Sequence, residues 1–336
     1  MNRDKLNFRV ILRIGFSLLP ILFGMPTIAM VICAYNLAMS FVFCGPLTAF
    51  VSSLSAVCIS MFFCSSYGVG AQLQGLFLAI EAILCAAACI YAVLFKKSFY
   101  PGVWLAAGGF LVPSFISLYN DAAKAGMSVA QYLTQLPLEM LRLQLESVPA
   151  ELQQAGFNAV AVEKILEKVG EITVMVIPSM LILCSVVIGY IVVWSVTSQL
   201  RKLPFGIKHS FSHIRLPRSM VAVLALSLIL LLWGIWEELS YISANVFLVL
   251  IFLCFFAGMS FVDYYLRRVI HGNFIRILIH IFVIITATTT TMISPFINIF
   301  VIYALIAVVD SFADFRKLSL EEEKRGDLDE TEKRDA

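Results

Sequence analysis

Charged residues are scarce in this chain: Asp, Glu, Lys and Arg make up 14% of its 336 residues, against about a quarter in soluble domains. Hydrophobic residues reach 60%, and the mean hydropathy is +0.92. This balance excludes an ordinary soluble domain. A bilayer core is about 30 Å thick, and a helix crosses it in about 20 residues. The apolar runs are long and continuous, so we predict an all-α integral membrane protein rather than a barrel.

The sequence also lacks the common motifs of catalysis and metal binding. It contains no P-loop, no nucleophile elbow and no HExxH run, whose residues would supply phosphate binding, a nucleophile or zinc ligands. The eight cysteines all lie in apolar stretches, where free cysteine packs as a small apolar side chain. We therefore expect no catalytic residues, no metal and no cofactor, and any ATPase that drives transport would be another chain.

About ten transmembrane helices, with eight as the lower bound, follow from the apolar runs and the basic loops. Basic residues in 201–218, in 267–276 and after residue 315 should face the cytoplasm. The basic N-terminus should lie there too, and so should Lys96 and Lys97, which follow the span at 73–95. The chain from the N-terminus to Lys96 therefore crosses an even number of times, and residues 11–66 must cross an odd number of times. Glycine and proline in "GMP" and "CGP" break that stretch into three short spans, or into one span and a re-entrant pair. The later spans are predicted at 73–95, 102–118, 172–198, 219–238, 243–266, 277–292 and 296–312.

The chain divides into two membrane halves and a tail. Residues 1–200 hold six spans, and residues 201–318 hold four. The charged tail, 319–336, lacks apolar residues for a core and is expected to be disordered. We expect a bacterial inner-membrane location with both termini in the cytoplasm.

A long extracytoplasmic segment, 119–171, is predicted to contain amphipathic helices. "SVAQ" at 128–131 is typical of a capping box, with serine as the N-cap and glutamine three residues later. A second helix should end near Val169, before the next span begins near residue 172. The segment is either a cap on the outer face of the bundle or a lid over a cavity.

Glu81 is the main candidate for function because it interrupts the apolar run "LAIEAILCAAAC". A charged residue at mid-membrane costs roughly 2.5–3.5 kcal/mol on insertion scales, and such residues usually face the bundle interior and mark substrate or ion paths. Gln74, seven residues earlier, lies on the same helix face, and Asn36 is a further polar residue within a span. A carboxyl group in a cavity indicates a cationic or hydrogen-bonding ligand, or proton coupling. The alternatives for Glu81 are a single structural hydrogen bond or a shifted span that places it nearer the interface. The alternative for Asn36 is an interhelical bond, since Ala34 and Ala38 beside it form a small-xxx-small pair that suits helix packing.

Three motifs lie in the second half: "HSFSHIRLPRSM" (209–220), "GMSFVDYYLRR" (258–268) and "VVDSFADFRKL" (308–318). They resemble the YybS-like family of bacterial membrane proteins. The N-terminal part of that family is similar to the substrate-binding S components of energy-coupling-factor vitamin transporters. The resemblance implies six helices with a ligand pocket on the outer side, and small residues such as Ala34 and Ala38 that dock a coupling subunit.

The same family pattern implies a cluster of charged residues at the cytoplasmic ends of the last spans. Asp263 would pair with Arg267, and Asp314 would pair with Arg316. These pairs would fasten helices together or form a docking surface for a cytoplasmic partner. The candidate members are Asp263, Arg267, Asp310, Asp314 and Arg316.

The leading functional hypothesis is a transport protein that binds or moves a small solute through its N-terminal half. Its partners would be the lipid bilayer, the solute and a separate energising protein, and no nucleic acid, because the excess basic residues serve to orient short loops. A second hypothesis is a non-transporting membrane scaffold that docks partner proteins. A third, an enzyme acting on lipid-linked substrates, is disfavoured by the lack of paired catalytic residues.

Overall fold

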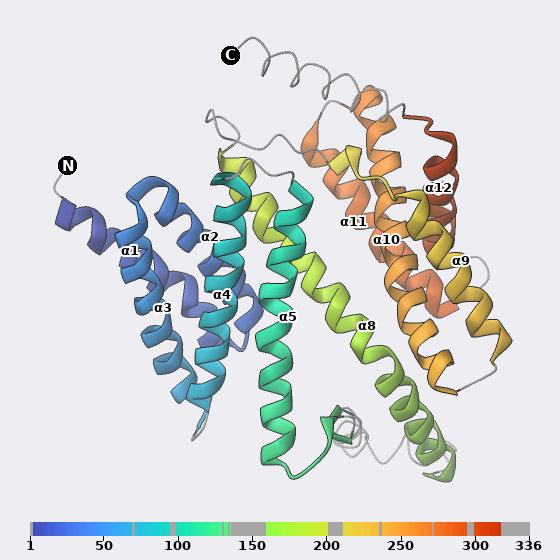
Figure 1. Cartoon of the computed structure of the whole chain (residues 1–336), viewed down its shortest axis with the longest axis horizontal. Coiled ribbons are helices and arrows are strands. Elements are labelled where there is room, and N and C mark those ends of the chain that lie inside the picture. Colours follow the sequence, from blue (N-terminus) through green and yellow to red (C-terminus); the bar gives the residue numbers. More distant parts are fainter. Residues whose placement is uncertain are drawn as a thin grey trace, which may run out of the picture. The chain divides into compact units, whose positions relative to one another are not determined.

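The computed structural model describes residues 3–316 except 69–70, 95–98, 130, 134, 136–158, 201–210, 235–236, 271 and 294–298 (Figure 1). Within these ranges the regular elements are all helical, which confirms the all-α fold class. The α-helices are α1 (Arg3–Leu18), α2 (Pro26–Cys44), α3 (Pro46–Ser65), α4 (Ala71–Leu94), α5 (Phe99–Lys124), α8 (Ala159–Leu200), α9 (Arg218–Trp233), α10 (Glu237–Val269), α11 (Asn273–Ile293) and α12 (Ile299–Ala313), and two 3₁₀ turns are η1 (Leu19–Phe23) and η2 (Phe211–His213).

Six of the described helices are long and apolar enough to cross a membrane: α2, α3, α4, α5, α8 and α10. Three more, α9, α11 and α12, are apolar but have apolar stretches of only 10–17 residues. A multi-pass membrane protein is therefore supported. The total of eight to ten spans stays a prediction.

Gly-Pro punctuation divides the N-terminal stretch into three helices, as the sequence indicated. Gly24 ends η1 with φ 72°, and Gly45 ends α2 with φ 90°. Side chains rarely adopt such positive φ angles, so glycine suits both places. Pro26 and Pro46 then begin α2 and α3, where a missing backbone N–H costs nothing.

The capping box is confirmed, but the helices after it differ from the prediction. The backbone N–H of Ser128 donates to Gln131 Oε1 at 3.0 Å, and that of Gln131 donates to Ser128 Oγ at 3.3 Å. The predicted break near Val169 is wrong, because α8 runs unbroken from Ala159 to Leu200. Gly170 lowers helix propensity by only about 1 kcal/mol, too little to end a helix of this length. The rest of the predicted lid, 136–158, lies outside the described residues.

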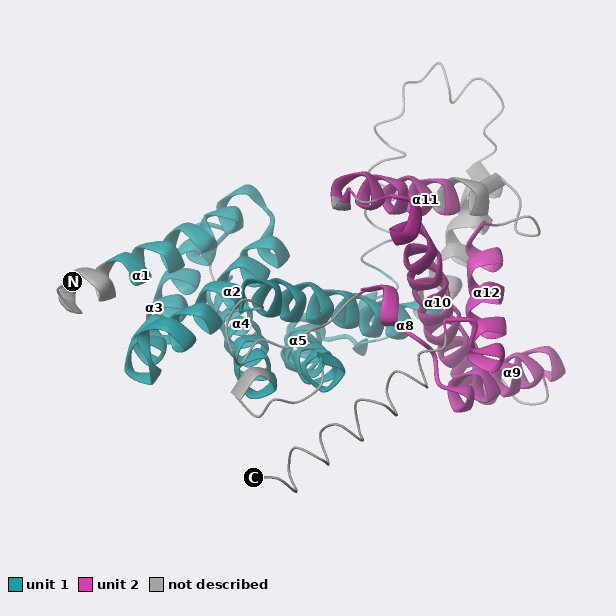
Figure 2. Ribbon diagram, turned by 90° about the horizontal axis from the view of Figure 1, so that it is seen from above, with its two compact units in different colours: residues 1–208 teal, residues 209–336 magenta. Residues whose placement is uncertain are grey.

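The chain forms two compact units, Met1–Lys208 and His209–Ala336 (Figure 2). Unit 1 holds α1 to α5 and α8, and unit 2 holds η2 and α9 to α12. The buried core of unit 1 is rich in alanine and cysteine, small side chains that let helices approach closely. Ala34 and Ala38 belong to this core and are both 0% exposed. They therefore pack inside unit 1, and the expectation that they present a docking face is wrong.

Gly75 and Gly109 lie at two of the close helix crossings in unit 1. At Gly75 on α4, an added Cβ would lie 2.6 Å from the backbone oxygen of Ser60 on α3. Ser60 Oγ also donates to the carbonyl oxygen of Gly75 at 2.8 Å. At Gly109 on α5, an added Cβ would lie 2.9 Å from Leu84 Cβ on α4. The absence of a side chain at these two positions thus sets how closely α3, α4 and α5 pack.

Two neighbouring glycines on α5 provide a matched test of this packing. Gly109→Ala should destabilise the protein by about 1–3 kcal/mol, because the new methyl group overlaps α4. Gly108→Ala should be neutral or stabilising by up to about 1 kcal/mol, because a Cβ there meets nothing within 4 Å. Thermal unfolding of the two detergent-purified variants measures the difference, and equal midpoints would show that α4 and α5 do not depend on this contact.

Candidate functional site

A cavity of about 600 Å³ lies at the end of unit 1 where η1 turns into α2, α3 ends and α4 begins. It is bounded by α4 and α5, with single residues from α8 and from the segment after α5. In the predicted topology this is the extracytoplasmic end. The lining residues are Ile21, Gly24, Pro26, Thr27, Cys64, Tyr67, Gln74, Phe77, Leu78, Glu81, Phe110, Ser114, Ser117, Leu118, Asp121, Leu133 and Leu181.

Glu81 is the most buried charged group of this cavity, with 9% of its surface exposed. It lies on α4, and Ser114 Oγ from α5 donates a hydrogen bond of 2.6 Å to Glu81 Oε1. The second carboxyl oxygen, Oε2, has no hydrogen-bond partner among the described residues. A carboxyl group in an apolar setting is costly unless its oxygens are bonded. The arrangement leaves one acceptor position for a ligand.

The remaining charge of the cavity is also negative. Asp121 lies near the end of α5. Its Oδ1 lies 3.7 Å from Lys124 Nζ, and the Lys124 side chain is 53% exposed, so this ion pair is weak. None of the described residues that line the cavity is basic. Gln74, seven residues before Glu81, adds an amide to the lining. The cavity therefore favours a positively charged or hydrogen-bond-donating group.

Tyr67 fixes the wall of the cavity next to α2. Its hydroxyl group donates to the carbonyl oxygen of Ile21 and accepts from the backbone N–H of Gly24 at 3.2 Å. These bonds tie the turn after η1 to the segment that follows α3. The aromatic rings of Tyr67, Phe77 and Phe110 all line the same cavity, and aromatic faces attract cations.

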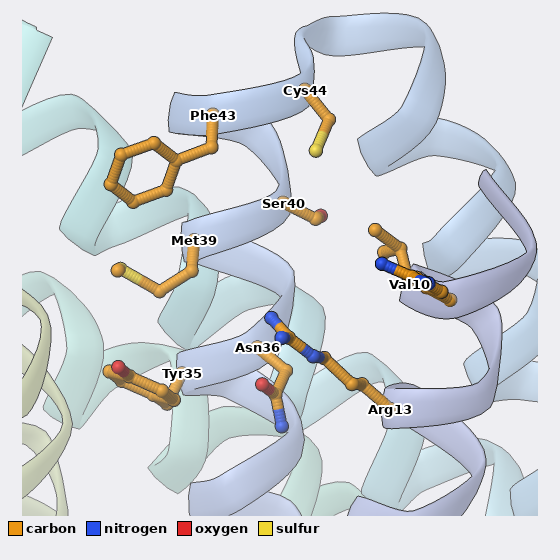
Figure 3. A pocket seen from close by; sticks show the side chains of 9 residues that line it. Val10, Arg13, Tyr35, Asn36, Met39, Ser40, Phe43 and Cys44 are labelled. Carbon is orange, nitrogen blue, oxygen red and sulfur yellow. The ribbon is translucent and has the colours of Figure 1, made fainter. Parts of the chain in front are cut away.

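Only two of the three predicted ligand-binding residues meet. Gln74 and Glu81 line the same cavity, whereas Asn36 lines a different pocket, of about 320 Å³ (Figure 3). Of the residues of α2, only Pro26 and Thr27 line the Glu81 cavity. Asn36 lies nine residues after Thr27, a distance of about 14 Å along the helix axis at 1.5 Å per residue. The expectation that Asn36 joins Glu81 is therefore wrong. Ser114, the direct partner of Glu81, was missed because an isolated serine in an apolar helix carries no signal in the sequence.

In unit 2 the guanidinium group of Arg316 is buried and fully bonded. Its Nε and Nη2 donate to Asp310 Oδ2 at 3.1 and 2.7 Å. Its other bonds go to Ser212 O at 2.7 Å, Ser260 Oγ at 3.0 Å and Ile214 O at 2.9 Å. These bonds use all five N–H donors of the side chain. Side-chain exposures of 1% for Arg316 and 2% for Asp310 leave neither available to a partner protein.

Arginines of the "LPR" segment cap the C-terminal end of α12. Arg215 Nη2 donates to Ser311 O at 3.0 Å, and Arg218 Nη2 donates to Phe312 O at 3.2 Å. The last carbonyl groups of a helix lack partners within the helix, and cations there also complement its dipole. The segment before α9 is thereby fastened to the end of the chain's last described helix.

The predicted pairing of Asp314 with Arg316 is wrong. Asp314 pairs with Arg215 at 2.9 Å, and Arg316 pairs with Asp310. Asp314 follows the end of α12 and has a positive φ of 46°. The chain therefore leaves the helical path at Asp314, and Arg316 points back toward Asp310. The structure divides the predicted cluster into separate ion-pair groups.

The second group surrounds Asp263, which is 4% exposed. Arg267 Nε lies 2.9 Å from Asp263 Oδ2, so the structure brings these two predicted residues together. Arg276 Nη1 and His280 Nε2, both from α11, lie 3.4 Å from Asp263 Oδ1. The group joins α10 to α11. Among the residues that the structure describes, no three His, Cys, Asp or Glu side chains gather as they would around a metal ion.

Removing the buried arginine of unit 2 tests whether this network fastens the helices. Arg316→Ala should destabilise the protein by about 3–5 kcal/mol, because it leaves the Asp310 carboxylate buried without its partner. Arg268→Ala is the control, because Arg268 is exposed and stacks on Tyr264 at 5.0 Å, a contact that contributes about 0.5–1 kcal/mol. Unfolding midpoints of the full chain measure both. A role for Arg316 in fastening would be refuted by equal losses.

Comparison with known proteins identifies a family for the chain but no individual relative. No curated protein and no solved structure matches it. The resemblances to YybS-like proteins and to S components stay predictions. One family matches nearly the whole chain, over residues 10–310. The chain therefore belongs to DUF2232, a family described as predicted membrane proteins.

Proposed function

We propose that unit 1 binds a small cationic or hydrogen-bond-donating solute at Glu81 and moves it across the membrane. The observation that carries this proposal is the half-satisfied carboxyl group inside a cavity of about 600 Å³. Ionisable residues within spans typically face such cavities and mark substrate or ion pathways. Membership in a family of predicted membrane proteins is compatible with this function and does not specify it.

The size and lining of the cavity fit a small solute with an apolar body. Ligand sites commonly enclose about 300–1,000 Å³, with mostly apolar walls and a few polar groups that orient the ligand. Glu81 and Asp121 supply negative charge, while Phe77 and Phe110 supply aromatic surface. A protonated amine on an apolar scaffold would use both features. It would gain a charge-assisted hydrogen bond to the carboxylate and contacts with the rings.

Ser114 has a positioning role in this proposal. Its bond to Glu81 Oε1 holds the carboxyl group across the α4–α5 contact. The other oxygen, Oε2, is then the acceptor for the solute. The energy for transport would come from proton coupling through Glu81 or from a separate protein partner, because the sequence contains no P-loop.

Replacing the carboxyl group should remove the bound solute while the fold remains. Mass spectrometry of small molecules retained by purified Glu81→Gln should show at least about tenfold less of a solute that wild-type protein retains. A hydrogen bond to a charged group contributes about 1.5–3 kcal/mol, and 1.4 kcal/mol corresponds to tenfold in affinity. Ser114→Ala, which keeps the carboxyl group but frees its orientation, should give a smaller loss.

Gln72→Ala is the matched control, since Gln72 is an exposed residue of α4 that does not line the cavity. It should retain the solute at the wild-type level, and all variants should unfold at similar temperatures. Identical solute profiles for wild type and Glu81→Gln would remove the basis for a ligand at Glu81. The bond to Ser114 would then be structural, and the scaffold hypothesis would be preferred.

A further inference from the structure

The second pocket of unit 1 lies between α1 and α2 and has the opposite charge to the Glu81 cavity. It encloses about 320 Å³ and is lined on one side by residues of the C-terminal half of α2 (Figure 3). Two arginines and no carboxylate are among the described residues around it. These residues are Arg9, Val10, Arg13, Tyr35, Asn36, Met39, Ser40, Phe43 and Cys44.

The arginines of this pocket lie on one face of α1 and are not neutralised. Arg9 and Arg13 are four residues apart, so their side chains are neighbours on the helix surface. No described carboxylate pairs with either. Elsewhere in the described chain, Arg267, Arg276 and Arg316 each lie within 3.4 Å of a carboxylate oxygen. The positive charge of Arg9 and Arg13 is therefore available to a ligand.

Asn36 provides a polar group on the facing helix. Figure 3 shows the Arg13 side chain extending from α1 toward Asn36 on α2. Asn36 is half-buried, and its amide group has no hydrogen-bond partner among the described residues. Its two N–H donors add to the five of each guanidinium group. Donors from two helices thus converge on one pocket.

The remaining wall of the pocket is apolar. Val10, Met39 and Phe43 line it beside the polar groups, and Figure 3 shows Met39 and Phe43 on the same side of α2. A ligand that fits both parts carries an anionic head and an apolar or uncharged body. Guanidinium groups match phosphate oxygens in a planar, bidentate geometry.

We propose that this pocket binds a phosphate group. Its source is the headgroup of an anionic phospholipid or a soluble phosphate compound. The positive-inside pattern places Arg9 and Arg13 near the cytoplasmic face, and basic pockets between membrane helices on that face are known to hold anionic headgroups. The inference does not rest on a solute at Glu81, because no residue that the structure describes lines both pockets.

Lipid retention by the full chain tests the first source. Purified protein in micelles that contain equal amounts of phosphatidylglycerol and phosphatidylcholine is analysed by native mass spectrometry. Wild type should retain phosphatidylglycerol selectively, and Arg9→Gln/Arg13→Gln should reduce that selectivity by about tenfold or more. Arg13→Lys should lose part of it, because lysine keeps the charge but not the planar fork. Arg268→Gln, a change of the same chemistry at an exposed arginine of unit 2, should match wild type.

Inorganic phosphate tests the second source. It should raise the unfolding midpoint of wild type relative to chloride at equal ionic strength, and it should leave the double variant unchanged. Selectivity for phosphatidylglycerol identifies a lipid headgroup, and a response to inorganic phosphate without lipid selectivity identifies a soluble ligand. The proposal is overturned if wild type and the double variant behave alike in both assays while retaining similar stability.

Discussion

A charged side chain inside an apolar helix bundle needs a partner, and this constraint governs both units of the protein. An ion taken out of water loses several kcal/mol of solvation even after the surroundings relax. In unit 2 the positive charge of Arg316 is met within the chain, since all its donors are used and two of them go to Asp310 Oδ2. Asp310 Oδ1 has no hydrogen-bond partner in the described part of the chain, but it is buried and closed to a ligand. In unit 1 Glu81 has one hydrogen-bond partner, and Arg9 and Arg13, which are both exposed, pair with no described carboxylate. The difference separates groups that hold helices together from groups that are open to a ligand.

Small residues make this difference possible in unit 1. Glycine at 109 lets α5 approach α4 closely, and the same two helices bring Ser114 to Glu81. A bulkier residue at the crossing would separate the helices and weaken the one bond that Glu81 makes. The close packing of α4 and α5 at Gly109 therefore helps to form the hydrogen bond between Ser114 and Glu81. This coupling explains why a site built on α4 and α5 needs rigid helices rather than loops.

Patterns that are local in sequence predicted the structure well, and contacts between distant segments did not follow from them. The breaks at Gly24 and Gly45, the capping box at Ser128 and the shared face of Gln74 and Glu81 all depend on spacings of ten residues or fewer. The Ser114–Glu81 bond spans 33 residues, and nothing in either helix marks the other as its partner. Asp314 and Arg316 show a related error. The family pattern predicted their pairing, but the chain turns at the end of α12 and places Arg316 against Asp310 instead.

The two pockets lie toward opposite ends of α2 and have opposite charge. Between them α2 presents Ala29 and Ala34, both fully buried in unit 1. A solute bound at Glu81, as proposed, would therefore meet packed small residues along α2, because no described residue lines both pockets. If unit 1 moves such a solute, its helices must slide or tilt against one another, as they do in the alternating access of membrane carriers. Contacts between small side chains and glycines resist such movement less than interlocked large side chains, since they involve few atoms at each crossing. On this argument the alanine- and glycine-rich packing of unit 1 is what would have to yield for the proposed solute to pass, whereas α10 and α11 of unit 2 are joined by ion pairs.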